Sequence, residues 1–155
     1  KTAYAMLRSL VGSEMCIRDR MLPVFVYNDG NQKKYVLQTR GQGLWDAIWA
    51  YVSMDENMTI QGIYFDHKAE TPGLGANIKQ RFFMDDFIGE ALLDSNGNFK
   101  GVNVSKTNLD PKNIDKYDNE VDAIAGSTIT GDGVTAMIRS DLSLYQSYFN
   151  NIKNN

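Results

Sequence analysis

Short runs of β-branched and aromatic residues alternate with clusters of Asn, Asp and Gly along much of the chain, a pattern typical of antiparallel hairpins. Residues 24–27 and 35–39 are two such runs on either side of an Asn-Asp-Gly-Asn cluster, and they predict a first hairpin. Residues 91–93 and 99–104 flank the cluster Asp-Ser-Asn-Gly-Asn and predict another hairpin farther along the chain.

The most aromatic run covers residues 44–53, and a polar stretch at residues 54–58 joins it to another β-favouring run at residues 59–65. Its two tryptophans and its tyrosine favour a strand. The alternative is a helix, because Trp45 and Trp49 are four residues apart and also fit one helical face. We predict the strand, and with it a hairpin formed by the two runs.

Helical spacing is found in two segments. Residues 76–87 predict one or two short helices from apolar side chains about one turn apart, namely Ile78, Phe82, Phe83 and Phe87. The end of the chain carries an i, i+3, i+4 stripe that is apolar except at one aspartate, and it predicts an amphipathic helix. Its members are Val134, Met137, Ile138, Asp141, Tyr145, Tyr148 and Phe149. Polar residues 107–120 lie between these segments and predict a surface loop.

The sum of these elements is one α+β domain of antiparallel hairpins with a C-terminal amphipathic helix. A chain of 155 residues is long enough for one such domain. Residues 1–20 have no sustained apolar period, and their second half resembles translated adapter sequence, so we set them aside as a non-native segment and place the domain at residues 21–155. We expect a native N-terminal membrane anchor to be missing, because Met21-Leu22-Pro23-Val24 looks like mid-domain sequence.

Charge and cysteine content exclude several kinds of site. The chain has a formal net charge of −3, and residues 21–155 carry 12 basic and 17 acidic side chains, which argues against a nucleic-acid partner. The one cysteine, Cys16, lies in the segment set aside, and we place the one histidine, His67, in a loop. Iron–sulfur, zinc and thiol chemistry are therefore poorly supported, and we predict no metal site. Redox chemistry would need an acquired organic cofactor.

Three hydroxyl side chains lie within residues 127–130, where the last helix is expected to begin. Backbone N–H groups and the helix dipole attract a phosphate at such a position. A phosphoryl group on Thr130 would face these N–H groups, with Gly131 and Gly133 letting the backbone approach it closely. The alternative is that Thr130 and Asp132 only cap the helix, because Ser, Thr and Asp are the usual caps.

Two glycine-containing clusters precede the hydroxyl cluster: Gly41-Gln42-Gly43-Leu44-Trp45 and Glu70-Thr71-Pro72-Gly73-Leu74-Gly75. Together with Ala125-Gly126-Ser127-Thr128-Ile129-Thr130, they resemble the FMN-binding domain of the C subunit of the sodium-translocating NADH:quinone oxidoreductase. The resemblance covers residues 22–149. The chain departs from the motif of that family at Ala125, where Ser or Thr is usual, and at Ser127, where Ala is usual.

The resemblance implies that FMN is joined through a phosphoester to Thr130. Loop 70–75 would border the isoalloxazine ring, with Glu70 at its polar edge. Leu44 is the better candidate for a flavin contact, whereas packing in a core strand explains Trp45 better. Lys106 either offsets negative charge on the cofactor or is solvated at the surface. The cofactor-binding residues implied are Thr130, Thr128, Ile129, Ser127, Gly126, Glu70, Thr71, Gly73, Leu74, Gly75, Leu44, Trp45 and Lys106.

The function implied by the resemblance is electron transfer through covalent FMN in a sodium-pumping complex of the bacterial inner membrane. The flavin supplies the redox chemistry, so no side chain is required as catalyst and Thr130 is a tether. The resemblance further implies other membrane subunits as partners, a flavin transferase for maturation and a domain that faces the periplasm. One alternative is the G subunit of an Rnf-type complex, which shares the Glu-Thr-Pro-Gly-Leu-Gly motif. Another is a cofactor-free extracytoplasmic binding module.

Overall fold

The computed structural model of the chain describes residues 11–17, 20–30, 32–108, 110 and 112–153. Its elements in chain order are β1 (Val11–Ile17), β2 (Arg20–Asp29), β3 (Gln32–Gln42), β4 (Ala47–Met54), β5 (Ile60–His67), the 3₁₀ helix η1 (Gly75–Lys79), α2 (Arg81–Asp86), β6 (Asn103–Val104), β7 (Glu120–Val121), α3 (Thr128–Ser143) and α4 (Gln146–Lys153).

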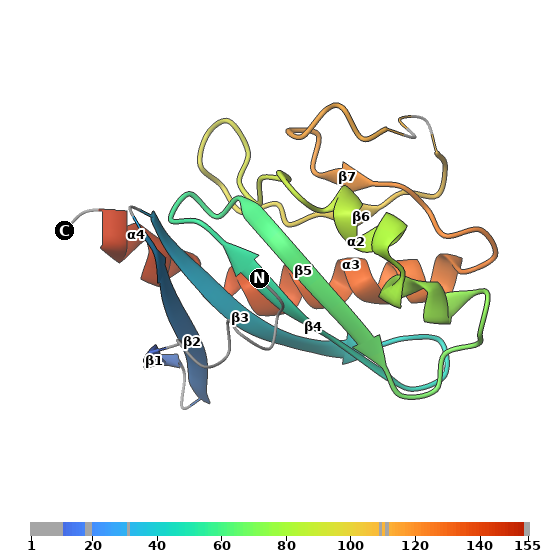
Figure 1. Ribbon diagram of the computed structural model, residues 1–155, viewed down its shortest axis with the longest axis horizontal. Coiled ribbons are helices and arrows are strands. Elements are labelled where there is room, and N and C mark those ends of the chain that lie inside the picture. Colours follow the sequence, from blue (N-terminus) through green and yellow to red (C-terminus); the bar gives the residue numbers. More distant parts are fainter. Residues whose placement is uncertain (1–10, 18–19, 31, 109, 111, 154–155) are drawn as a thin grey trace.

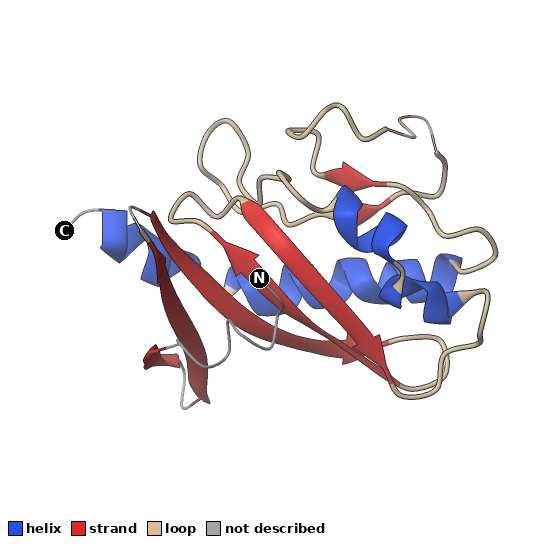
Figure 2. Cartoon of the chain, in the orientation of Figure 1, coloured by secondary structure: helices blue, strands red, loops and turns tan. Residues whose placement is uncertain are grey.

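An antiparallel sheet forms one layer of the molecule, with its five strands in the order β1-β2-β3-β4-β5 (Figure 1). The long helix α3 crosses one face of this sheet, as Figure 2 shows. It packs mainly against β3. The close approach depends on Gly41 of β3, because an added Cβ there would lie 2.7 Å from the Cβ of Met137. The predicted α+β class is confirmed.

The predicted C-terminal helix is two helices. α3 ends at Ser143 and α4 begins at Gln146, but the apolar stripe continues across the break. Its buried members are Val134, Met137, Ile138, Tyr145 and Phe149, and Leu142 beside the stripe is buried too. The ring of Phe149 packs edge-on against Tyr35 of β3, with ring centroids 5.1 Å apart, so α4 also covers the sheet. Across the described ranges, no helix has the length and apolar character needed to cross a membrane.

The first two hairpins are confirmed, with longer strands than predicted in β2 and β3. The start of the second hairpin is wrong by three residues, because β4 begins at Ala47 and not at Leu44. Residues 43–46 form a tight turn in which the N–H of Gly43 donates to the carbonyl of Asp46 at 2.9 Å. The helical alternative for this run is also wrong.

The third predicted hairpin reduces to a single bridge between Leu93 and Phe99. The N–H groups of Lys100 and Gly101 both donate to the carbonyl of Leu92, and Gly101 has a φ of +73°, so the chain turns away from the pairing. Strand β6 instead pairs in parallel with β7. The local sequence pattern did not predict this pairing, because each of the two strands is only two residues long.

Two short helices, η1 and α2, confirm the prediction for residues 76–87. Phe83 and Phe87 pack against Phe65 of β5, with ring centroids 5.5 and 5.2 Å apart. Phe82, which was expected in the same stripe, is 59% exposed, because α2 turns it away from the sheet. The stripe is therefore narrower than the spacing suggested.

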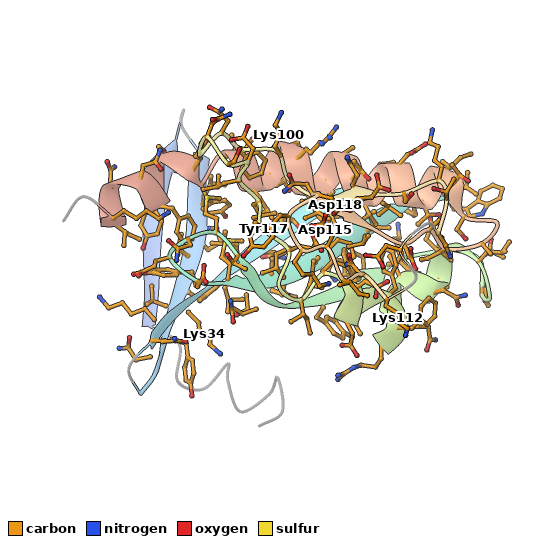
Figure 3. All side chains as sticks on the ribbon, turned by 90° about the horizontal axis from the view of Figure 1, so that it is seen from above. Lys34, Lys100, Lys112, Asp115, Tyr117 and Asp118 are labelled. Carbon is orange, nitrogen blue, oxygen red and sulfur yellow. The ribbon has the colours of Figure 1, made fainter. Side chains whose placement is uncertain are left out.

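The predicted surface loop is anchored to the rest of the domain at its centre. The side-chain amide of Asn113 is buried and donates to the carbonyl of Asp86 at 2.6 Å and to Glu90 Oε1 at 3.0 Å. Lys116 Nζ also donates to the carbonyl of Asp86, at 2.8 Å. The labels Lys112, Asp115, Tyr117 and Asp118 in Figure 3 mark the course of this loop.

The adapter-like segment contributes β1, which pairs antiparallel with β2 from Val11↔Val26 to Ile17↔Arg20. Residues 1–10 and 18–19 of this segment lie outside the described residues. That residues 1–20 are non-native stays a prediction.

Candidate functional site

The site is built on the buried carboxylate of Glu70, which follows β5 by three residues. The N–H of Glu70 donates to Nδ1 of His67 at 3.2 Å, which holds the chain as it leaves the strand. Glu70 Oε1 accepts a hydrogen bond from the N–H of Trp45 at 2.9 Å. The turn between β3 and β4 is thereby fastened to the loop after β5.

The other oxygen of Glu70 holds the predicted tether. Thr130 Oγ1 donates to Glu70 Oε2 at 2.6 Å, and Thr130 is 1% exposed while Glu70 is 4% exposed. The pair joins residues 60 positions apart in the sequence. Because a hydrogen bond to an ionised acceptor is shorter and stronger than a neutral one, this contact fixes the rotamer of Thr130.

Electrostatics favour the ionised form of Glu70. Burial acts to raise the pKa of this carboxyl, but it accepts hydrogen bonds from the Thr130 hydroxyl and from the backbone N–H groups of Trp45, Leu44 and Asp46. These bonds stabilise the carboxylate and hold its pKa below the ordinary value. Glu70 is therefore a buried anion at neutral pH.

Glycines surround the carboxylate because there is no room for side chains. A Cβ added at Gly43 would lie 2.6 Å from Glu70 Oε1. One added at Gly75 would collide with Glu70 Oε2 and would lie 2.5 Å from Thr130 Oγ1. The turn at Gly43 and the start of η1 at Gly75 thus close over the pair from two sides.

The third cluster meets the second at Gly126 and Leu74. Gly126 has a φ of +70°, and an added Cβ would lie 2.9 Å from Leu74 Cδ2. The loop itself is stabilised by the N–H groups of Leu74 and Ala76, which both donate to the carbonyl of Thr71 at 3.1 Å. The indole N–H of Trp45 donates to Thr71 Oγ1 at 3.1 Å. All three clusters singled out in the sequence therefore converge.

Helix α3 begins at Thr128, within the stretch where the last helix is expected to begin. Thr130 and Asp132 lie inside the helix, so the alternative that they only cap it is wrong. Gly131 and Gly133 also have a packing role that the sequence did not predict: a Cβ at Gly131 would lie 3.0 Å from Val104 Cγ1, and one at Gly133 would collide with the carbonyl oxygen of Gln42. These glycines let α3 pack against β6 and against the end of β3.

The N-cap residue Ser127 makes no side-chain capping hydrogen bond. Its hydroxyl oxygen is buried and has no hydrogen-bond partner among the described residues. Buried polar groups usually have a partner, so an orphaned hydroxyl beside the first N–H groups of a helix is suited to an anion.

Large apolar side chains are exposed around the buried pair. Leu44 is 44%, Leu74 is 42% and Ile129 is 58% exposed, one from each of the three converging clusters. Trp45 is 65% exposed, so the expectation that it packs in a core strand is wrong. These four exposed apolar side chains surround the buried pair, and we call them the apolar rim: Leu44, Trp45, Leu74 and Ile129.

Lys106 lies beside α3, and its ion pair is with Asp132 of that helix and not with a residue of the three converging clusters. Its Nζ is 4.0 Å from Asp132 Oδ1, and both side chains are more than half exposed. An exposed pair at this distance stabilises the fold little. Gly43 and His67 are the site residues that the sequence did not predict. Gly43 lies inside a recognised motif, and the prediction of a loop at His67 is wrong, because His67 is the last residue of β5.

Three comparisons connect this geometry to known proteins. The model of the family described as FMN-binding domain matches residues 43–143. The chain is 31% identical over 123 residues to the C subunit of the Na(+)-translocating NADH-quinone reductase of Pseudomonas aeruginosa, covering 78% of the chain and 46% of the relative. It is 36% identical over 124 residues to the protein of that name from Yersinia pestis, covering 76% and 44%. The chain thus spans less than half the length of these curated relatives.

Solved structures are also similar. The protein of the same name from Parabacteroides distasonis is 40% identical with a TM-score of 0.74, over 83% of this chain and 63% of that one. The structure of Shewanella oneidensis NqrC is 24% identical with a TM-score of 0.71, over 99% of this chain and 76% of that one, and this likeness bears on the fold alone.

Proposed function

Because this chain belongs to the FMN-binding domain family, we propose that it carries FMN as an electron-transfer part of a sodium-translocating NADH:quinone oxidoreductase, with the flavin joined by a phosphoester to Thr130. Bound FMN supplies one- and two-electron redox chemistry that the side chains lack. The domain is the stretch 21–155.

The observation that carries this proposal is the convergence of three sequence-distant loops on Thr130, each with an exposed apolar side chain. The apolar rim suits a flat ring, and ligand sites combine such surfaces with a few placed polar groups. The orphaned Ser127 hydroxyl and the start of α3 suit the phosphate. The residues present therefore fit a flavin phosphate.

Each part of the site has one task in this proposal. Thr130 is the tether, and Gly126, Ser127 and Thr128 border the phosphate. The ring is contacted by Leu44, Trp45, Leu74 and Ile129, and also by Thr71 and Gly73. Glu70 and Gly75 hold the loops beneath the ring in place. Lys106 is close enough to the first turns of α3 to add positive charge near the phosphate.

The larger assembly is inferred from the relatives. Their name includes sodium translocation, NADH and quinone, so we assign this chain to a membrane complex with further subunits. We place the domain on the periplasmic side of the bacterial inner membrane, behind an N-terminal anchor, and assign its maturation to a flavin transferase. The relatives compared above support the C subunit over an Rnf-type G subunit, and the family match disfavours a cofactor-free module.

The test is the intact mass of the chain after co-expression with a flavin transferase. We expect an increment of FMN minus water and a fluorescent band on a denaturing gel, both lost in Thr130→Ala. Thr107→Ala is the matched control, because Thr107 is an exposed threonine after β6 with no part in the proposed site, and it should leave the increment unchanged. An increment that survives in Thr130→Ala contradicts the tether.

A further inference from the structure

The hydroxyl that must receive the flavin is closed off from solvent. Thr130 is 1% exposed, and its Oγ1 lies 2.6 Å from a carboxylate oxygen of Glu70, itself 4% exposed. Phosphoryl transfer requires the attacking oxygen to approach phosphorus roughly in line with the bond that breaks. A donor bound to a second protein has no such path to this oxygen.

The cover over the hydroxyl is main chain and not a mobile side-chain tip. An added Cβ at Gly75 would lie 2.5 Å from Thr130 Oγ1, so the backbone of the loop after β5 lies directly against the oxygen. Leu74, the residue before it, packs so close to Gly126 that a Cβ added at Gly126 would lie 2.9 Å from Leu74 Cδ2. Exposure of the hydroxyl therefore requires movement of loop 70–75.

The same contact is incompatible with the attached state. An ester oxygen has no proton to donate, so at 2.6 Å it would face the Glu70 oxygen as a second acceptor. A phosphodiester anion would also be placed beside a buried carboxylate, which is unfavourable. Thr130 must leave Glu70 to be modified, and it cannot return afterwards.

We propose that Glu70 and Gly75 hold the Thr130 hydroxyl in a closed state and that flavin attachment takes place only from a locally open state of loop 70–75. This rests on the proposed attachment at Thr130. In the open state, Thr130 Oγ forms a bond to the flavin-side phosphorus of a flavin dinucleotide. The phosphoanhydride bond breaks, the nucleoside monophosphate leaves, and the hydroxyl proton passes to water. Glu70 is a positioning residue in this scheme.

The test follows modification of the purified, flavin-free full chain by a flavin transferase with flavin adenine dinucleotide and Mg²⁺, read as intact mass against time. For the unmodified sequence we expect the rate to reach a plateau as transferase concentration rises, because loop opening becomes limiting. Gly75→Ala, which forces the loop off the pair, and Glu70→Ala, which removes the acceptor, should each raise the plateau rate by about tenfold, the equivalent of one hydrogen bond.

The variant Leu142→Ala distinguishes local opening of loop 70–75 from unfolding of the whole domain. Leu142 is fully buried in α3, far along the helix from Thr130, so this variant destabilises the whole domain without touching the loop. Its plateau rate should match that of the unmodified sequence. A rate as high as that of Gly75→Ala overturns the local mechanism.

The remaining outcomes are equally distinct. A rate that rises in proportion to transferase without a plateau, or a slower rate in Glu70→Ala, overturns the closed state while leaving Thr130 as the tether. No increment in any chain, or an increment in Thr130→Ala, overturns the proposed attachment and the inference together.

Discussion

The carboxylate of Asp141 in α3 accepts a hydrogen bond from the backbone N–H of Arg40 in β3, with Oδ2 and the nitrogen 2.8 Å apart. Strand β2 pairs with β3 only as far as Val24↔Leu37, so this N–H lies on a stretch of strand edge that β2 does not reach. The one polar member of the helix stripe therefore satisfies a sheet donor. A helix thus covers the edge that the neighbouring strand leaves open.

Replacing Asp141 should test this contact. We expect Asp141→Ala to lower the free energy of unfolding by about 1–2 kcal/mol, because a backbone donor loses a charged acceptor. Asp141→Asn keeps an acceptor oxygen and should lose less than half of that. Urea unfolding measures both, and Asp132→Ala, in an exposed pair on the same helix, should be nearly neutral. Equal losses in the Ala and Asn variants would contradict a hydrogen-bonding role.

The lowered pKa of Glu70 predicts a loss of stability in acid. Its pKa is lower in the folded chain than in the unfolded chain, so its contribution is present above the unfolded pKa and is lost as pH falls through the folded one. We expect the difference in unfolding free energy between the unmodified sequence and Glu70→Gln to shrink by about 1–3 kcal/mol below pH ~4.

Thr130→Val provides the control for that pH series. It removes the hydroxyl that donates to Glu70 but keeps the volume, so it should move the acid transition of the unmodified sequence to higher pH. Urea midpoints between neutral pH and strong acid are the measurement. An unchanged transition in Thr130→Val would mean that the backbone donors alone set the pKa of Glu70.

We expect Gly133→Ala to lower the stability of the fold, although Gly→Ala inside a helix usually raises it. Gly→Ala inside a helix normally stabilises by about 1 kcal/mol. At Gly133 the new Cβ would collide with the carbonyl of Gln42, so we expect a loss of about 2 kcal/mol as α3 is pushed off β3. Gly62→Ala is the matched control, because no atom lies within 4 Å of its Cβ position, and it should stabilise slightly. Thermal unfolding distinguishes the two signs.

Local patterns predicted most of the fold, because hairpins and helix stripes are encoded by residues close in sequence. The sheet strands β2 to β5 and the α+β class are confirmed for this reason, and so is the resemblance to the family, which depended on three short motifs. The prediction was wrong where structure depends on distant pairing, as in β6 with β7, or on where a turn begins, as at Leu44.

For the site, too, the local sequence predicted the residues but not the contacts between distant ones. The motifs named Glu70 and Thr130 separately, but nothing local indicates that a carboxylate and a hydroxyl 60 residues apart would share a hydrogen bond. Glycines are the clearest example. Gly131 and Gly133 suggested room for a phosphate, whereas their missing side chains make room for Val104 and Gln42. The sequence indicates that no side chain fits at these two glycines, but only the packing of the fold identifies the residues that occupy the space.

Glu90 is a buried acid outside the site and predicts a pH dependence of the opposite sign to that of Glu70. It is fully buried, and burial raises its pKa to about 7, although the Asn113 amide and the Lys116 ammonium, 3.6 Å from Oε1, act in the other direction. Its folded pKa is above its unfolded one, so its contribution is full below pH ~4.5 and is lost as pH rises through the folded value.

We therefore expect the unmodified sequence to lose stability between mildly acidic and mildly alkaline pH relative to Glu90→Gln, which is neutral throughout, by about 1–3 kcal/mol. Urea midpoints at several pH values measure this difference. Lys116→Met removes the nearby cation and should enlarge the loss, because it raises the pKa of Glu90 further. Parallel pH profiles for the unmodified sequence and Glu90→Gln would mean that Glu90 stays in one protonation state across this range and that its burial has no pH-dependent cost.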